Sequence, residues 1–170
     1  MSIRVVLADD HAILRHGLSQ SFQNEKDIEV VGEAQDGLSA VALVRKLSPD
    51  VVVMDIGMPE LNGIETTRRI LREQPQVKII GLSMHAGDKY VREMFRAGAS
   101  GYLLKNSPFE ELVEAIKTVV QGKTFISPSV GELIISEYVK KPHAADSAYS
   151  VLSQREREVL QLVAEGKSTK

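Results

Sequence analysis

Five short runs of large apolar residues, separated by segments with helical spacing, constrain the fold of this chain more than any other feature. The runs are Ile3–Ala8, Ile28–Ala34, Val51–Met54, Val77–Leu82 and Gly101–Leu104. Most are nearly continuous in Val, Ile and Leu, as expected of strands that are covered on both faces. Strands that alternate with helices predict a doubly wound α/β fold with five parallel strands and helices on both sides of the sheet.

Residues that typically begin and end helices predict where the first domain ends. Ser107-Pro108-Phe109-Glu110 matches a capping box with proline at the first helical position, so the last of the intervening helices is expected to begin there. Gly122 follows that helix, where a C-terminal stop is expected. Residues 1–123 are therefore expected to form one domain.

The alternation of strands and helices ends after this domain. Ser127-Pro128 predicts the start of a linker helix, and residues 140–150 contain few large apolar groups, which favours a flexible linker. A further helix is expected from Ser153, which is spaced to form a capping box with Glu156. We therefore expect a linker over residues 124–150 and a separate segment over residues 151–170.

Composition and charge exclude several classes of function. The chain has 21 Lys and Arg against 23 Asp and Glu, and residues 124–170 carry equal numbers of both signs, so no basic excess indicates a nucleic-acid surface. The absence of cysteine excludes disulfides and thiolate metal sites. The sequence contains neither an apolar run approaching the roughly 20 residues of a membrane helix nor a signal peptide. We expect a cytoplasmic protein without a membrane partner.

Polar residues follow the carboxyl ends of four of the five expected strands. Asp9 and Asp10 follow the first, Asp55 the third, Ser83 the fourth and Lys105 the fifth. Ligands of open parallel sheets bind beyond the carboxyl ends of the strands, so these side chains are expected to form one site. Each residue alone would more often be a cap, a turn former or a solvated loop residue, and the prediction depends on their joint arrangement.

The charges of this expected site favour phosphoryl chemistry with a magnesium cofactor. Three neighbouring carboxylates repel one another unless one is protonated or a cation holds them. A partly hydrated Mg²⁺ suits one or two carboxylates together with phosphate oxygens. A carboxylate can attack phosphorus to give an aspartyl-phosphate. That reaction needs neutralisation of charge, which the metal, Lys105 and the Ser83 hydroxyl would supply.

Other interpretations of the same residues are weaker. His11 adjoins the acidic pair, but no second histidine is placed to join it, so we interpret it as a loop residue. No phosphate-binding glycine loop is present. Phosphatases of the haloacid-dehalogenase type have a second acid two residues after the nucleophile, whereas Gly57 stands two residues after Asp55. A small Mg²⁺-dependent phosphatase or phosphotransferase using the same carboxylates remains the alternative.

The motifs at these strand ends resemble those of two-component response regulators of the NarL/FixJ type. The matching pieces are Val-Leu-Ala-Asp9-Asp10-His, Val-Val-Met-Asp55-Ile-Gly-Met-Pro59, Leu-Ser83-Met-His and Ala-Gly-Ala-Ser-Gly-Tyr102-Leu-Leu-Lys105. Together they extend over most of residues 3–121 and are highly specific for a receiver domain. A second segment, from Leu152 through Ser168, resembles the opening of a LuxR-type helix-turn-helix domain. The resemblance implies the flavodoxin-like strand order 2-1-3-4-5.

The resemblance also implies a role for each matching residue. Asp55 would accept the phosphoryl group, and together with Asp10 and the Gly57 carbonyl it would bind Mg²⁺ directly. Asp9 would bind the metal through water, and Lys105 would contact the phosphoryl group. No other cofactor is implied.

Two further residues would carry the signal away from the phosphorylated aspartate. Ser83 would hydrogen-bond the phosphoryl group on activation, and Tyr102 would be an aromatic switch that turns inward behind it. The alternative for Tyr102 is an ordinary, partly exposed tyrosine on an edge strand. Gly57 is a partial departure from the family pattern, because other members often carry a side chain at this position. Without a side chain there, the phosphoryl group would be less shielded.

We therefore expect a phosphorylation-activated response regulator rather than an enzyme. It would take its phosphoryl group on Asp55 from a sensor histidine kinase, form a homodimer and control transcription. The helix-turn-helix segment lacks its recognition helix, so DNA binding is expected only of a longer protein in which that domain is complete. Its first helix, near Gln154–Glu165, is expected to fray or to dock on the receiver.

Overall fold

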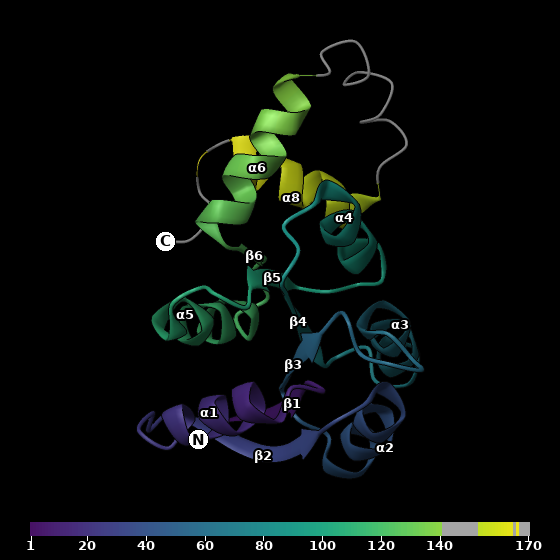
Figure 1. Cartoon of the computed structure of the whole chain (residues 1–170), viewed down its shortest axis with the longest axis vertical. Helices are drawn as coiled ribbons and strands as arrows, with labels where there is room; N and C mark the ends of the chain where they lie inside the picture. The colour runs from purple at the N-terminus through teal and green to yellow at the C-terminus, as the bar shows by residue number, and fades with distance from the viewer. Residues whose placement is uncertain (141–152, 165, 167–170) are drawn as a thin grey trace.

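Six parallel strands form one sheet in the order β2-β1-β3-β4-β5-β6 (Figure 1). The computed structural model describes residues 1–140, 153–164 and 166. Its strands are β1 (Ile3–Ala8), β2 (Ile28–Ala34), β3 (Val51–Asp55), β4 (Lys78–Ser83), β5 (Gly101–Leu104) and β6 (Phe125–Ile126). Every neighbouring pair is parallel, as the helical connections between the strands require.

Helices cover both faces of this sheet. The helices are α1 (Ala12–Phe22), α2 (Gly37–Leu47), α3 (Gly63–Glu73), α4 (Asp88–Arg96), α5 (Phe109–Val119), α6 (Pro128–Val139) and α8 (Gln154–Ala164). Figure 1 shows α1 and α5 on one side of the sheet and α2, α3 and α4 on the other. Helices α6 and α8 lie near α4, toward the β6 edge of the sheet. The doubly wound α/β fold is thus confirmed.

The hydrophobic core consists of two layers, one on each face of the sheet. Side chains alternate along β1, so Val5 and Leu7 join the layer that contains Phe22 of α1, whereas Val6 and Ala8 join the opposite layer. All four β1 side chains are at most 1% exposed. Burial on both faces explains why the strand sequences are continuously apolar. The packing of these side chains also fixes the position along the sheet at which each strand ends.

The predicted strands agree with the structure to within one residue at their ends, but the predicted number of five is wrong. The order 2-1-3-4-5 is confirmed, and β6 extends the sheet beyond β5. Backbone hydrogen bonds from Phe125 to Ser100 and from Ser127 to Tyr102, both 3.0 Å long, attach the new strand. A strand of two residues is too short to show a hydrophobic period, which is why the sequence pattern missed it.

One of the two predicted capping boxes is wrong and the other is confirmed. Pro108 occupies the N-cap position of α5, and no side chain caps that helix, because the chain is still extended at this proline and becomes helical only at Phe109. At the start of α8, the Ser153 amide donates to Glu156 Oε2 over 2.7 Å, and the Glu156 amide donates to Ser153 Oγ over 3.3 Å. The linker helix predicted at Ser127-Pro128 is also present, as α6.

Helix α8 docks against α4 and against the residues just before β5, which is one of the two outcomes expected for it. Arg96 of α4 lies 2.6 Å from the carboxylate of Glu156, which is only 5% exposed. Arg155 donates through Nε to the Ala99 carbonyl over 3.0 Å, and its Nη2 hydrogen-bonds Ser100 Oγ. The apolar side of α8 packs in the same core layer as α4 and α6. Beyond Lys140, the linker predicted at 140–150 falls outside the described residues, as do residues 167–170.

Candidate functional site

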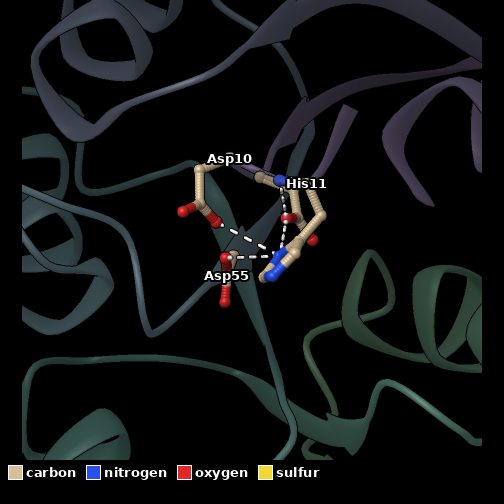
Figure 2. A group of neighbouring side chains, drawn as sticks. Asp10, His11 and Asp55 are labelled. Atoms are coloured by element: carbon tan, nitrogen blue, oxygen red, sulfur yellow. Dashed lines mark hydrogen bonds and ion pairs between the residues drawn. The ribbon is translucent and has the colours of Figure 1, made fainter. Parts of the chain in front are cut away.

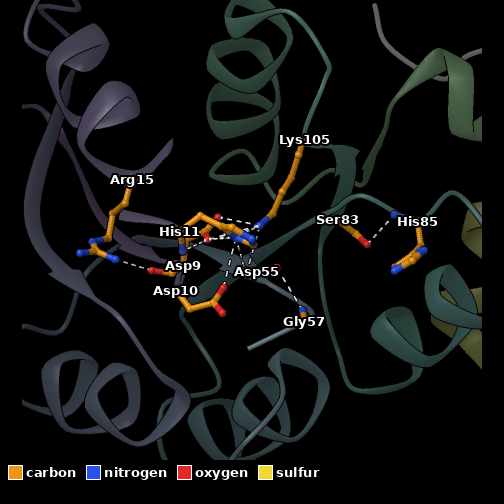
Figure 3. A network of polar contacts seen from close by, with 9 residues as sticks. All are labelled: Asp9, Asp10, His11, Arg15, Asp55, Gly57, Ser83, His85 and Lys105. Atoms are coloured by element: carbon orange, nitrogen blue, oxygen red, sulfur yellow. Dashed lines mark hydrogen bonds and ion pairs between the residues drawn. The ribbon is translucent and has the colours of Figure 1, made fainter. Parts of the chain in front are cut away.

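The carboxyl ends of β1, β3 and β5 bring four of the predicted site residues together; Figure 3 labels all four, and Figure 2 shows Asp10 and Asp55 around His11. Asp9 and Asp10 follow β1 directly, Asp55 is the last residue of β3, and Lys105 follows β5. One oxygen each of Asp9, Asp10 and Asp55 and one nitrogen of His11 lie within 4.8 Å of one another. Parallel strands that end at one edge of the sheet produce this convergence, as the sequence predicted.

An ammonium group lies between the two most buried carboxylates of the cluster. Lys105 Nζ is 3.1 Å from Asp9 Oδ2 and 3.2 Å from Asp55 Oδ2, and all three side chains are at most 5% exposed. Buried charges of this kind require partners, and one ammonium cannot neutralise two carboxylates. Asp10, whose side chain is 32% exposed, adds a third carboxylate. The site therefore retains an excess of negative charge that favours a cation.

Two buried oxygens of the cluster fit a metal ligand set. Within the described part of the chain, neither Asp9 Oδ2 nor Asp55 Oδ2 receives a hydrogen bond, and their contact with Lys105 is ionic. Buried carboxylate oxygens normally have a donor or a metal as partner. Oxygen donors in this number suit a partly hydrated Mg²⁺. The acidic cluster is therefore compatible with Mg²⁺ binding.

His11 joins this cluster, contrary to its interpretation as a loop residue outside the site. Its Nδ1 atom lies 2.9 Å from Asp9 Oδ1, 3.2 Å from Asp10 Oδ1 and 2.8 Å from Lys105 Nζ. This nitrogen can donate to Asp9 only when protonated and can accept from Lys105 only when unprotonated, so the two hydrogen bonds exclude each other. The sequence argument failed because it looked for a second histidine, whereas the partners of His11 are carboxylates and an ammonium.

Backbone groups shape the loop that follows Asp55. The Gly57 amide donates to Asp55 Oδ1 over 3.0 Å, and the Gly63 amide at the start of α3 donates to the Ile56 carbonyl over 3.0 Å. A Cβ atom on Gly57 would lie 3.8 Å from Asp55 Oδ1, so a side chain there would stand beside the Asp55 carboxylate. A Cβ atom on Gly63 would lie only 2.2 Å from the Asp55 carbonyl oxygen. Helix α3 therefore begins in direct contact with the backbone of Asp55.

Ser83 and Tyr102 both contact the loop after β4. Ser83 Oγ accepts a hydrogen bond from the His85 amide over 2.9 Å, and Figure 3 shows it apart from the carboxylates. Tyr102 donates through its hydroxyl to the His85 carbonyl over 2.6 Å and is fully buried. Burial raises the pKa of Tyr102 to about 12, against an opposing effect of the Ser83 hydroxyl. The alternative of a partly exposed edge-strand tyrosine is wrong, because β6 lies outside β5.

Arg15 is a residue of this region that the sequence argument missed. It lies on α1 and is buried, and its Nη1 donates to the Asp9 carbonyl oxygen over 2.5 Å (Figure 3). Its Nε donates to Glu33 Oε2 at the end of β2 over 3.2 Å. The available signal was Glu33 itself, an acidic residue at the same edge of the sheet as the site and next to the first turn of α1.

Comparison with known proteins identifies this arrangement. Residues 5–117 match the family model of the response regulator receiver domain. The transcriptional regulatory protein DegU of Brevibacillus brevis is 39% identical over 182 residues, which cover 99% of this chain and 77% of DegU. The oxygen regulatory protein NreC of Staphylococcus carnosus is 37% identical, over 99% of this chain and 80% of NreC.

A solved structure agrees with these relatives. A two-component response regulator of the LuxR family from Aurantimonas sp. SI85-9A1 superposes with a TM-score of 0.78 at 38% identity, over 82% of this chain and 99% of that chain. Among the described residues, no helix has both the length and the apolar character needed to cross a membrane. The receiver match, the relatives and the cluster of carboxylates at the sheet edge together show that this chain belongs to the response regulators of the NarL/FixJ type.

Proposed function

We propose that the chain is switched by phosphorylation of Asp55, that a sensor histidine kinase in the cytoplasm supplies the phosphoryl group, and that the outcome is control of transcription. The observation that carries this proposal is the environment of Asp55. Its carboxylate is 3% exposed, lies 3.2 Å from Lys105 Nζ and shares its surroundings with two further carboxylates. Family membership and the relatives named above support the regulatory role.

The chemistry requires one bond to form and one to break. A carboxylate oxygen of Asp55 attacks phosphorus, the bond from phosphorus to the imidazole nitrogen of the kinase breaks, and the departing imidazole takes up a proton from solvent. Phosphoryl transfer depends on positioning and on neutralisation of charge rather than on further covalent steps. Lys105, whose side chain is 5% exposed, supplies one positive charge 3.2 Å from Asp55 Oδ2.

Mg²⁺, when bound, would supply positive charge that neutralises the phosphoryl oxygens. Asp10, Asp55 and the Gly57 carbonyl would hold the ion directly, and Asp9 would hold it through water. The two buried oxygens without hydrogen bonds, on Asp9 and Asp55, support this assignment. The imidazole of His11 is a less suitable ligand for Mg²⁺, which prefers oxygen, so we assign it no place in the metal's coordination.

The proposed switch runs from Asp55 through Ser83 to Tyr102. Ser83 would leave the His85 amide and turn to the phosphoryl group, which would loosen the loop between β4 and α4. Tyr102 is already inward and holds the other side of this loop through the His85 carbonyl. Because α4 packs against α8, a change in this loop has a direct path to the C-terminal segment.

We also propose the domain boundaries 1–123, 124–150 and 151–170, with dimerisation of the receiver on phosphorylation. DNA binding would belong to a complete helix-turn-helix domain. The candidate dimer faces are the helical segments 88–97 and 110–121, which present apolar or mixed faces near the site. The first of them is partly covered by α8 through Arg96 and Glu156. A dimer that uses this face therefore requires α8 to leave it, whereas the face at residues 110–121 imposes no such requirement.

The enzyme alternative is less well supported. A phosphatase needs a group that protonates the leaving oxygen, and the position two residues after Asp55 is a glycine. Turnover of small phosphoesters in the presence of Mg²⁺ would favour the alternative. Labelling that stops at one phosphoryl group per molecule would favour the switch.

Intact-mass measurement tests the proposal. Incubation with acetyl phosphate and Mg²⁺ should add the mass of one phosphoryl group, and Asp55→Asn should abolish this gain because the amide cannot act as the nucleophile. Asp50→Asn is the matched control, because Asp50 lies just before the opposite end of β3 and accepts a hydrogen bond from the Arg4 amide. Full labelling of Asp55→Asn would contradict the assignment.

A further inference from the structure

A buried arginine lies behind the acidic pair and does not touch the reacting atoms. The side chain of Arg15 is 11% exposed, and its guanidinium lies between α1 and the ends of β1 and β2. Arginine is rarely buried unless it is paired, because removal of its charge from water is costly. Its two hydrogen bonds, to the Asp9 carbonyl and to Glu33, therefore indicate a specific function in this part of the fold.

The Asp9 carbonyl is held in a way that determines where Asp10 points. The Asp9 amide donates to the Ala34 carbonyl over 3.0 Å, and the Asp9 carbonyl accepts from Arg15 over 2.5 Å, so both backbone polar groups of Asp9 are fixed. The carbonyl of Asp9 and the amide of Asp10 belong to one planar peptide unit. Fixing the direction of that carbonyl therefore fixes the position from which the Asp10 side chain leaves the backbone.

The far side of the arginine is fixed as well. Arg15 Nε donates to Glu33 Oε2 over 3.2 Å, and Glu33 is the neighbour of Ala34, whose carbonyl holds the Asp9 amide. The end of β2 thus holds Asp9 twice, once directly and once through Arg15. The planar guanidinium can make both hydrogen bonds at once in a set geometry, which a lysine ammonium on a flexible stem cannot reproduce.

We propose that Arg15 is a positioning residue for the metal site: it holds the Asp9–Asp10 peptide so that the Asp10 carboxylate faces Asp55. The inference rests on the proposed Mg²⁺ site and adds a residue from outside the acidic cluster to it. Groups that orient metal ligands commonly affect metal affinity by about 10- to 100-fold when they are removed.

Charge alone predicts the opposite effect, which makes the proposal testable. Arg15 is a cation close to a site that would bind a cation, so removal of its charge alone would strengthen Mg²⁺ binding. Loss of positioning would weaken it. A residue that contributes only to folding would change the melting temperature and leave Mg²⁺ affinity unaltered at temperatures at which the chain is folded.

The experiment is a titration of the isotope-labelled chain with MgCl₂, followed by the amide NMR shifts of residues near the acidic cluster. Arg15→Met should raise the dissociation constant for Mg²⁺ about 10-fold or more. Arg15→Lys should give an intermediate value, because it keeps the charge and one donor. The matched control is Arg4→Met, which removes an arginine at the opposite end of β1 that donates to the Ser48 carbonyl over 2.9 Å. It should bind Mg²⁺ like the unsubstituted chain.

The outcomes separate this inference from the proposed function. Unchanged or tighter Mg²⁺ binding by Arg15→Met, in a chain whose unsubstituted form binds the ion, would overturn the positioning role alone. Failure of the unsubstituted chain to bind Mg²⁺ would overturn the metal site and this inference together. If Arg15→Met does not fold, Arg15→Lys decides the question, because a dissociation constant equal to that of the unsubstituted chain would also overturn the role.

Discussion

Replacement of Gly63 by alanine should damage both the stability of the chain and its phosphorylation. The new Cβ atom would lie 2.2 Å from the Asp55 carbonyl oxygen, 2.7 Å from Ile56 Cα and 2.9 Å from the Asp55 carbonyl carbon. All three neighbours are backbone atoms, so no flexible side chain can move aside. Relief of the contact requires α3 and the Asp55 loop to separate by about 1 Å, because carbon atoms pack best at about 3.5–4.0 Å.

The expected losses of stability and of labelling rate follow from this displacement. Overpacking of a well-packed region costs about 1–3 kcal/mol, and a clash with backbone on three atoms places this substitution toward the upper part of that range. A loss of about 2 kcal/mol should lower the melting temperature by about 4–8 °C for a chain of this size. A displacement of about 1 Å at a reacting group can slow its reaction by about 100-fold, so labelling of Asp55 by acetyl phosphate should slow by that order.

Thermal unfolding followed by circular dichroism, together with the labelling rate from intact mass, measures both effects. Gly17→Ala is the matched control, because a Cβ atom on Gly17 in α1 would meet nothing within 4 Å. That substitution should stabilise the chain by about 0.5–1 kcal/mol and leave labelling unchanged. If Gly63→Ala melts and reacts like the unsubstituted chain, the close approach of α3 to the Asp55 backbone is refuted.

Three further predictions concern the metal, Tyr102 and α8. Asp10→Ala should weaken Mg²⁺ binding more than Asp9→Ala in a calorimetric titration, and equal losses would contradict the division into direct and water-mediated ligands. Alkaline titration of tyrosine absorbance should show Tyr102 ionising near pH 12. Because its pKa is raised on folding, its contribution to stability should be complete below pH 10 and lost between about pH 10 and 12; ionisation near pH 10 would indicate an outward ring. Glu156→Ala removes the side-chain half of the α8 capping box, which accepts from the Ser153 amide, and the partner of Arg96. It should therefore cost about 1–2 kcal/mol and speed amide exchange in α8 about 5- to 30-fold, whereas unaltered exchange would argue against the docking contact.

The strands and the acidic cluster could be predicted from the sequence because both depend on local patterns. Continuous apolar runs mark strands that are buried on both faces, and polar residues directly after such runs must lie at one edge of a parallel sheet. Asp9, Asp55 and Lys105 were placed together by that rule alone. No knowledge of side-chain packing was needed.

The missed features depend on contacts between distant parts of the chain. Arg15 and Glu33 are 18 residues apart, and Arg155 and the Ala99 carbonyl are 56 residues apart, so no local period reports either contact. The burial of Tyr102 depends on β6, a strand of only two residues. The place of His11 in the cluster depends on the direction of its ring, which the sequence does not encode in any simple spacing.

Location of the phosphoryl group tests the central claim most directly. The chain labelled with acetyl phosphate and Mg²⁺ can be reduced with borohydride, which converts an aspartyl-phosphate to homoserine, and then digested and sequenced by mass spectrometry. The account predicts homoserine at position 55 and no other change among the acidic residues. Homoserine at Asp9 or Asp10, or a phosphoryl group retained on His11, would contradict it.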